Sequence, residues 1–159
     1  MVMLMKSKYR VIGIMSGTSL DGLDIAYCVF ENRQSGWKYS IEQSSAVKYS
    51  PKWLSRLSRA HTLAGADLMA LDADFGAYLG DLIGNFVLKH RVKVDFIASH
   101  GHTVFHQPEN GFTTQIGNGY SMAVASGLPV VYDFRMLDVA LGGEGAPLVP
   151  VGDKFLFNE

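Results

Sequence analysis

The sequence predicts an α/β protein in which helices flank a mixed β-sheet. Three β-rich runs joined by short turns fill residues 9–47, and a long stretch of helical periodicity covers residues 66–89. After it, strand-like and helical runs alternate between residues 92 and 133. Consecutive β runs with short connections pair antiparallel, whereas strands separated by a helix pair parallel, so one sheet with both kinds of pairing is expected.

The first three runs predict an antiparallel meander. Tyr9–Met15 is apolar enough for a central strand, and Leu23–Phe30 is rich in β-branched and aromatic residues. Residues 31–36 are polar and suit a turn, and Trp37–Val47 alternates loosely between polar and apolar residues. Connections this short join neighbouring strands.

Two helices are expected next. Pro51 suits the first turn of a helix over Lys52–Ala60, where its missing N–H costs nothing. Ala66–Lys89 is the longest helical stretch, with apolar residues at three- and four-residue steps. Glycines also fall four residues apart between residues 76 and 84, but aspartates interrupt the run. A soluble helix packed against a sheet is therefore predicted rather than a membrane helix.

The remaining chain alternates short strands and helices. The expected strands are Val92–Ser99, Thr113–Ile116 and Leu128–Asp133, and the expected helices are Tyr120–Ser126 and one beginning within Pro147–Phe157. Gly127 ends the first of these helices, and Pro129 stands at the start of a strand, where an absent N–H matters least. Residues 139–145 are rich in glycine and are expected to form a loop.

The composition is that of a globular protein, because 48% of the residues are hydrophobic and 18% are charged. The formal net charge is −1, so neither nucleic acid nor an anionic membrane is expected as a partner. Cys28 is the single cysteine, so an intrachain disulfide is excluded and a buried, inert thiol is expected. The apolar part of Met1–Arg10 is too short for a signal sequence or a membrane span, and a cytoplasmic location is expected.

The turn between the first two expected strands is the most informative segment. Residues 14–24 bring glycines, hydroxyls and carboxylates together. Glycine lets the backbone approach closely, so such a turn can direct N–H groups and hydroxyls at a phosphate. Asp21 is then placed to hold a magnesium ion, directly or through its waters. The segment matches neither a P-loop nor a dinucleotide-binding fingerprint, and an ordinary hairpin turn is the alternative.

A histidine cluster follows the expected strand Val92–Ser99. His100, His102 and His106 suggest metal ligands, but no carboxylate or cysteine lies at a supporting spacing. Alternate residues of an extended segment rarely close a tetrahedral site by themselves. A loop that contacts substrate at the end of the strand is the preferred interpretation, and an ordinary transition from strand to loop is an equal alternative.

A second polar cluster follows the last expected strand. Asp133, Arg135 and Asp138 combine a guanidinium with two carboxylates, a set that can grip a polyhydroxylated ligand or a ligand carboxylate. A structural ion pair between the arginine and an aspartate is an equally open alternative. The glycine-rich segment 141–147 can approach a ligand closely, act as a hinge, or simply connect two elements.

The order of elements resembles the ribonuclease H-like lobe of the sugar kinase, actin and heat-shock ATPase superfamily, in which the turn between the first two strands carries the nucleotide phosphates. Four motifs, in order, resemble the N-terminal part of the anhydro-N-acetylmuramic acid kinase family. They are Met-Ser-Gly-Thr-Ser-Leu-Asp-Gly at 15–22, Ser-His-Gly-His-Thr at 99–103, Thr-Gln-Ile-Gly at 114–117, and Asp-Phe-Arg at 133–135 followed by Gly-Gly-Glu-Gly-Ala-Pro-Leu-Val-Pro at 142–150.

The resemblance implies a cytoplasmic kinase of peptidoglycan recycling that uses ATP and Mg²⁺. Such enzymes convert 1,6-anhydro-N-acetylmuramic acid to N-acetylmuramic acid 6-phosphate, with water opening the ring at C1 and O6 taking the phosphoryl group. When the family's site is carried over to this sequence, Asp21 is the expected magnesium ligand. The residues expected at the ATP phosphates are Gly17, Thr18, Ser19, Leu20, Asp21, Gly22, Leu23 and Asp24. The residues expected to line the sugar-binding side are His100, Asp133, Arg135 and Asp138, and Arg135 is expected to bind the lactyl carboxylate of the sugar. Small molecules are the expected partners, and a homodimer is left open.

The sequence departs from the family pattern in three respects. The family commonly has glutamine where this chain has His102 and Glu144. These two differences affect the expected identity of the sugar substrate more than the assignment to the family. Its general-base aspartate belongs to an Asp-Thr-Gly motif that residues 1–159 lack, so this aspartate is expected downstream of Glu159 and no catalytic residue is expected here. Residues 1–159 are therefore expected to form a single, incomplete N-terminal lobe that is inactive alone, with the second lobe absent. A non-catalytic nucleotide- or muropeptide-binding module and a related kinase for another sugar are the alternatives.

Overall fold

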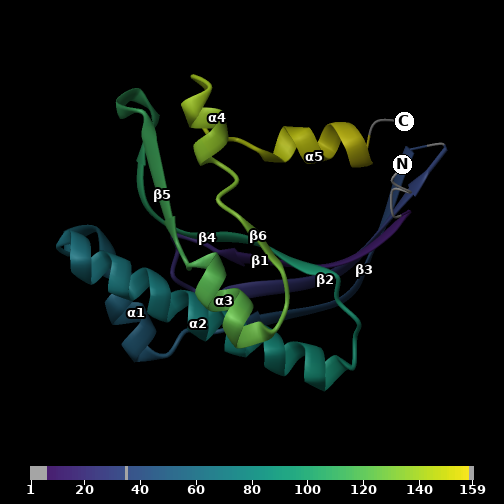
Figure 1. Cartoon of the computed structure of the whole chain (residues 1–159), viewed down its shortest axis with the longest axis horizontal. Helices are drawn as coiled ribbons and strands as arrows, with labels where there is room; N and C mark the ends of the chain where they lie inside the picture. Colours follow the sequence, from purple (N-terminus) through teal and green to yellow (C-terminus); the bar gives the residue numbers. More distant parts are fainter. Residues whose placement is uncertain (1–6, 35, 158–159) are drawn as a thin grey trace.

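The computed structural model describes residues 7–34 and 36–157, which form a mixed sheet with helices on both faces (Figure 1). The strand order is β3-β2-β1-β4-β5, and β6 pairs with β4. The strands are β1 Lys8–Ser16, β2 Leu23–Arg33, β3 Gly36–Val47, β4 Phe96–Gln107, β5 Phe112–Ile116 and β6 Val130–Tyr132. The helices are α1 Pro51–Ser58, α2 Gly65–His90, α3 Gly119–Ser126, α4 Met136–Ala140 and α5 Val149–Leu156, with short 3₁₀ turns at Ala60–Thr62 and Pro108–Asn110. The predicted α/β class is confirmed.

The first three strands form the predicted antiparallel meander. In its register, Leu23 pairs with Ser16 of β1 on one side and with Val47 of β3 on the other. Alternate residues of β1 and β2 enter the core, where Ile12 and Ile25 are at most 2% exposed. These side chains belong to the same apolar cluster as the buried face of α2. The meander and α2 therefore create the core beneath the first hairpin.

The glycines of α2 allow a second helix to pack against it. A Cβ atom at Gly76 would overlap the backbone of Asn118, and one at Gly80 would lie 2.7 Å from the Cβ of Ala125. Nothing lies within 4 Å of the corresponding position at Gly84. Gly76 and Gly80 thus allow α3 to approach α2 closely. The predicted packing of α2 on the sheet is a separate contact of the same helix.

The length of β4 corrects one expectation. The sequence predicts a loop over residues 100–103, but the strand continues to Gln107. Its first half pairs parallel with β1 and β6, and its second half pairs antiparallel with β5. Gly101 has a φ of 75°, and the pairing of β4 with β1 shifts register between Ile14 and Ser16. The extra residue bends the strand without ending it, because β5 becomes its new partner.

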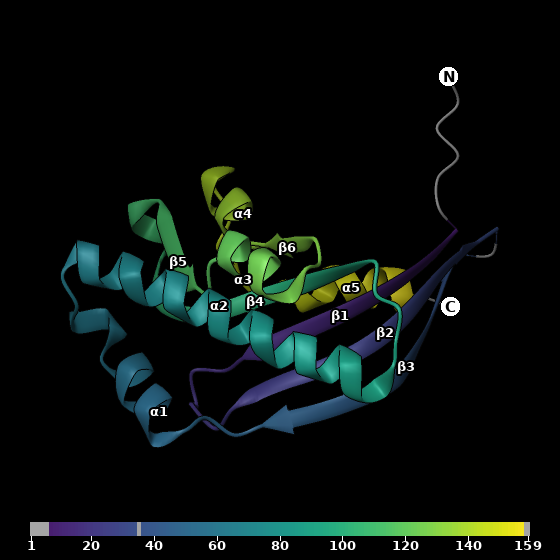
Figure 2. The same ribbon diagram turned by 60° about the horizontal axis from the view of Figure 1, so that its bottom comes forward.

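The two faces of the sheet carry different helices. α1, α2 and α3 lie on one face, and α4 and α5 lie on the other (Figures 1 and 2).

The loop expected over residues 139–145 is wrong at its start, because Val139 and Ala140 belong to α4. A helix of five residues is too short to show a periodic pattern in the sequence. The ring of Phe157, just beyond α5, lies 5.6 Å from the ring of Tyr39 in β3.

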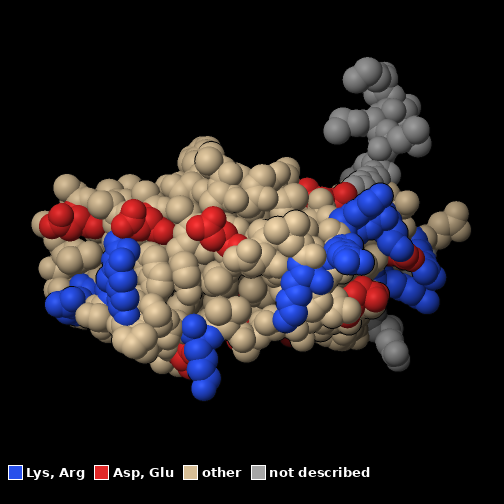
Figure 3. All heavy atoms as spheres, turned by 90° about the horizontal axis from the view of Figure 1, so that it is seen from below, with Lys and Arg blue, Asp and Glu red and all other residues tan. Residues whose placement is uncertain are grey.

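The surface carries charges of both signs. Lys, Arg, Asp and Glu side chains are interspersed on the face seen from below, so neither sign dominates it (Figure 3). Within residues 7–34 and 36–157, no helix combines the length and the apolar character that crossing a membrane requires.

Candidate phosphate- and sugar-binding site

The connection between β1 and β2 is a tight, exposed turn. The N–H of Leu20 donates to the carbonyl oxygen of Gly17 over 3.2 Å, and Leu20 itself has a left-handed φ of 60°. The hydroxyl of Ser19 donates to Oδ1 of Asp21 over 2.8 Å. The side chains of Thr18, Ser19 and Asp21 are exposed. The turn therefore presents hydroxyls and one oriented carboxylate to solvent, as binding of a phosphate with a cation requires.

The far end of this turn fits only glycine. Gly22 has a φ of 155°, and a Cβ atom there would overlap the carbonyl oxygen of Val47. The next residue, Leu23, is fully buried, so only its backbone can take part in binding. Asp24 is exposed on the opposite face of the sheet. The predicted phosphate segment thus divides into two parts. Residues 17–22 form a turn whose polar side chains are exposed, and Leu23 and Asp24 belong to β2 and point to opposite faces of the sheet.

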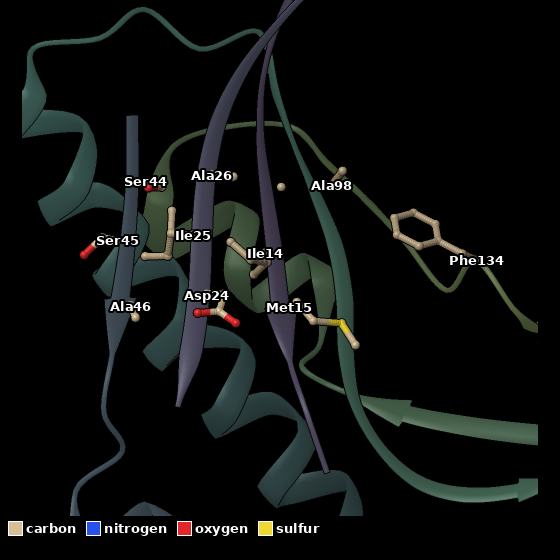
Figure 4. A pocket seen from close by; sticks show the side chains of 11 residues that line it. Ile14, Met15, Asp24, Ile25, Ala26, Ser44, Ser45, Ala46, Ala98 and Phe134 are labelled. Carbon is tan, nitrogen blue, oxygen red and sulfur yellow. The ribbon is translucent and has the colours of Figure 1, made fainter. Parts of the chain in front are cut away.

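Asp24 lines a pocket of about 770 Å³ on the face of the sheet that also carries α4 and α5 (Figure 4). The floor of this pocket is built from the small residues Gly13, Ala26 and Ala98, which leave room above the strands. Asp24 and Met15 stand at the end nearest the turn, and Phe134 stands at the side, in the segment after β6. A volume in this range suits a small-molecule ligand.

His100 and Arg135 meet on this same side of the sheet. The guanidinium Nε of Arg135 donates to Nε2 of His100 over 2.9 Å. Because Nε2 accepts, the ring proton is on Nδ1, which lies 3.1 Å from the carbonyl oxygen of Gly101 and donates to it. Burial lowers the pKa of His100, and the positive charge of Arg135 lowers it further, against an opposing contribution from the bond to Gly101. His100 is therefore held as the neutral imidazole.

Arg135 and Asp138 both hold the glycine-rich loop. Nη1 of Arg135 donates to the carbonyl oxygen of Gly145 over 2.6 Å, and the N–H of Gly145 donates to Oδ2 of Asp138 over 2.7 Å. The N–H of Gly143 donates to the backbone carbonyl of Asp138. The two side chains thus grip opposite ends of one residue, an arrangement different from the direct ion pair that the sequence left open.

Asp133 lies in other surroundings. It has a left-handed φ of 60°, is exposed, and lines a pocket of about 160 Å³ together with Asp72 and Asn118. Oδ1 of Asp72 accepts from the N–H of Gly117 over 2.7 Å, and its Oδ2 accepts from the side-chain amide of Asn118. The sequence analysis did not include Asp72 among the candidate site residues. A charged aspartate within the apolar run of α2 could have pointed to it.

The three histidines do not converge. His100 contacts Arg135, whereas His102 faces α2, where its ring lies edge-on to that of Phe75 at 6.4 Å. The extra residue at the bend of β4 sends the two side chains to opposite faces. His106 lies 3.1 Å from the hydroxyl of Thr113. Across the described part of the chain, no three histidine, cysteine, aspartate or glutamate residues are grouped to hold a metal ion.

The site also contains Tyr49, which the sequence analysis did not single out. The hydroxyl of Tyr49 donates to Oγ of Ser16 over 2.7 Å, and Oγ of Ser16 lies 3.2 Å from Nδ1 of His102. His102 therefore lies beneath the turn at residues 17–22, on the opposite face of the sheet from the side chain of His100. Glu144, the other departure from the family pattern, is exposed in the glycine-rich loop.

None of these residues is predicted to be the general base that the family resemblance implies. The sequence predicts it in an Asp-Thr-Gly motif downstream of Glu159. Glu159 itself lies outside the described residues, which end at Phe157. The position of the base therefore stays a prediction.

A mixed sheet in this order, with an exposed glycine and hydroxyl turn at its first hairpin beside a ligand-sized pocket, defines an α/β lobe of the sugar kinase and actin-like ATPase class. The sequence profile described as anhydro-N-acetylmuramic acid kinase matches residues 9–159. The chain belongs to the anhydro-N-acetylmuramic acid kinase family.

Individual relatives agree with this assignment. The chain is 36% identical over 156 residues to the anhydro-N-acetylmuramic acid kinase of Synechococcus elongatus, covering 94% of this chain and 41% of that protein. It is 40% identical over 153 residues to that of Acidithiobacillus ferrooxidans, covering 94% of this chain and 38% of the relative. The chain thus spans about two fifths of the length of these relatives and corresponds to their N-terminal part.

Proposed function

We propose that this chain is the N-terminal lobe of a cytoplasmic kinase that uses ATP and Mg²⁺ to convert 1,6-anhydro-N-acetylmuramic acid to N-acetylmuramic acid 6-phosphate during peptidoglycan recycling. The observation that carries the proposal is the pairing of Ser16 with His102 between the parallel strands β1 and β4. This pairing brings the turn at residues 17–22, which we call the phosphate turn, close to His100. It therefore also lies close to Arg135 and the glycine-rich loop, which His100 and Arg135 connect. A phosphoryl donor and a sugar acceptor need such adjacent sites.

The turn supports the nucleotide half of this proposal. Its exposed hydroxyls and backbone N–H groups are suited to the oxygens of the β- and γ-phosphates. Asp21, oriented by Ser19, is the residue that would hold Mg²⁺, directly or through water. When bound, Mg²⁺ supplies charge neutralisation at the phosphates.

The residues around Arg135 support the sugar half. Two of its nitrogens are engaged by His100 and Gly145, and the described residues offer no partner for Nη2. That nitrogen is suited to a ligand carboxylate, such as the lactyl group of muramic acid. In the reaction, water adds to C1 and loses a proton to a base, the C1–O6 bond breaks, and O6 takes the γ-phosphoryl group as ADP leaves. The base is expected from the Asp-Thr-Gly motif of the family, downstream of Glu159.

The test is an assay of the complete protein encoded by the reading frame that contains residues 1–159. It is incubated with MgATP and 1,6-anhydro-N-acetylmuramic acid, and ADP and sugar phosphate are measured together. Equal amounts of ADP and N-acetylmuramic acid 6-phosphate are expected. Ring opening without phosphate transfer would contradict the proposal, as would faster turnover of an anhydro-sugar that lacks the lactyl group. Nucleotide binding without any turnover would instead identify a non-catalytic module.

A further inference from the structure

Three buried polar side chains lie directly beneath the phosphate turn. Ser16 ends β1, Tyr49 follows β3, and His102 lies in β4, yet their exposed fractions are only 3%, 6% and 5%. They are connected in a chain from Tyr49 through Ser16 to His102. The partners of Ser16 are 33 and 86 residues away in the sequence, so the chain joins β1, β4 and the segment that follows β3.

The directions of these hydrogen bonds follow from the available protons. Tyr49 donates its only proton to Ser16, and the hydroxyl of Ser16 then has its own proton to give. Nδ1 of His102 accepts that proton when the ring proton is on Nε2. In this arrangement both ends of the chain are neutral, with Tyr49 as the terminal donor and His102 as the terminal acceptor.

The surroundings of the chain are apolar and strengthen it. Phe75, which is fully buried in α2, places its ring 6.0 Å from Tyr49 and 6.4 Å from His102. Burial raises the pKa of Tyr49 to about 12 and lowers that of His102. A hydrogen bond in such a medium is stronger than in water, and losing one partner leaves the other buried without compensation.

The chain contacts both ends of the turn. Ser16 immediately precedes Gly17, whose carbonyl oxygen accepts the hydrogen bond that closes the turn. At the other end, Gly22 packs against the carbonyl oxygen of Val47, only two residues before Tyr49. The segment from Val47 to Tyr49 therefore holds the last residue of the turn by close packing and the residue before the turn by a hydrogen bond.

We propose that Ser16, Tyr49 and His102 are positioning residues that fix the turn at residues 17–22 for the phosphates of the nucleotide. This inference rests on the proposed function, because it assigns a role to residues behind the same turn. None of the three side chains needs to touch the nucleotide. Their effect is to set the direction of the backbone at Gly17, on which the placement of the whole turn depends.

Steady-state kinetics of the complete protein tests this role. The variants are Ser16→Ala, Tyr49→Phe and His102→Leu, and the matched control is Ser99→Ala. Ser99 lies in the same strand as His102 and is 1% exposed, but its hydroxyl has no hydrogen-bond partner among the described residues. We expect Ser16→Ala and His102→Leu to lower kcat/KM for ATP by about tenfold or more. The KM for the sugar should change much less, and Ser99→Ala should match the wild type.

A conservative variant separates positioning from mere stability. The side-chain carbonyl of glutamine can accept the proton of Ser16 as Nδ1 of His102 does, so His102→Gln should recover most of the kcat/KM for ATP. The inference is overturned if Ser16→Ala and His102→Leu lower only the melting temperature and share the nucleotide kinetics of Ser99→Ala. It is also overturned if His102→Gln is as impaired as His102→Leu.

The proposed function and the positioning role can fail separately. If the wild type shows no turnover, the proposed function fails, and calorimetric titration of the same variants with MgATP then decides the positioning role. A weaker affinity in Ser16→Ala and His102→Leu than in Ser99→Ala supports it, and equal affinities contradict it. Should His102→Leu not fold, Ser16→Ala, Tyr49→Phe and His102→Gln still give the comparison.

Discussion

Arg135 donates from Nε to Nε2 of His100 over 2.9 Å, so a guanidinium and a neutral imidazole act as one unit although 35 residues separate them. The same guanidinium donates through Nη1 to the carbonyl oxygen of Gly145. Arg135 therefore links β4, the segment after β6 and the glycine-rich loop. Any change at this residue alters both the orientation of His100 and the position of the loop.

Replacing Arg135 by lysine should weaken sugar binding. A single ammonium group cannot donate to His100 and Gly145 in the fixed geometry of the guanidinium and also present a nitrogen to a carboxylate. We expect the KM for the anhydro-sugar to rise about tenfold, which corresponds to about 1.4 kcal/mol, with the KM for ATP nearly unchanged. Arg56→Lys is the matched control, because Arg56 pairs with Asp74 on the opposite face of the sheet. An unchanged KM for the sugar would assign Arg135 a purely structural role.

The depressed pKa of His100 predicts lower stability in acid. Its ordinary value is 6.5, and burial followed by the charge of Arg135 lowers it in the folded protein. Below pH 6.5 the unfolded chain takes up a proton that the folded protein does not, so the stability present above this pH is lost as the pH falls toward the folded pKa. The buried His102, whose pKa is also lowered, contributes with the same sign.

Thermal unfolding as a function of pH measures this effect. The melting temperature of the wild type should fall between about pH 7.5 and about pH 5.5, and His100→Gln should reduce that fall. Glutamine does not titrate, and its carbonyl can still accept from Arg135. His61→Gln, at an exposed position, is the control and should retain the wild-type slope. If His100→Gln and His61→Gln behave alike, His100 is not a source of the pH dependence.

Replacing Asp21 by asparagine should impair phosphoryl transfer. Asparagine keeps the size of the side chain and can still accept from Ser19, but it loses the negative charge that a cation requires. We expect kcat to fall by more than about tenfold at saturating MgATP, since positioning groups commonly contribute more than about 1.4 kcal/mol. Asp74→Asn on α2 is the control for loss of one carboxylate. A smaller effect would make Asp21 only a residue of the turn.

The sequence predicted the elements whose signals are local. The meander, the long α2 and the helix after Asn118 follow from periodicity and from residues that begin or end helices, and each is present. The continuation of β4 beyond Ser99 was not predicted, because it depends on pairing with β5. α4 was missed because it is a single short helix.

The candidate site shows the same division between local and long-range information. The turn at residues 17–22 could be identified from its own composition. The hydrogen bond between Tyr49 and Ser16 could not, because it joins residues 33 apart whose types are ordinary in a core. The separation of His100 and His102 was equally hidden, since simple alternation along a strand places residues two apart on the same face. Only the bend at Gly101 reverses that expectation.

The glycines of α2 provide a final test of how the helices pack. Gly76→Ala would force the new methyl group into the backbone of Asn118, whereas Gly84→Ala meets nothing within 4 Å. Alanine at residue 84 should stabilise the protein by about 0.5–1 kcal/mol, because it favours the helix without a steric penalty. Alanine at residue 76 should destabilise it by about 1–3 kcal/mol despite the same gain in helix propensity, because α3 must move away. The difference between the two melting temperatures measures the close packing of α3 on α2, and two equal shifts would show that Asn118 and its helix yield without cost.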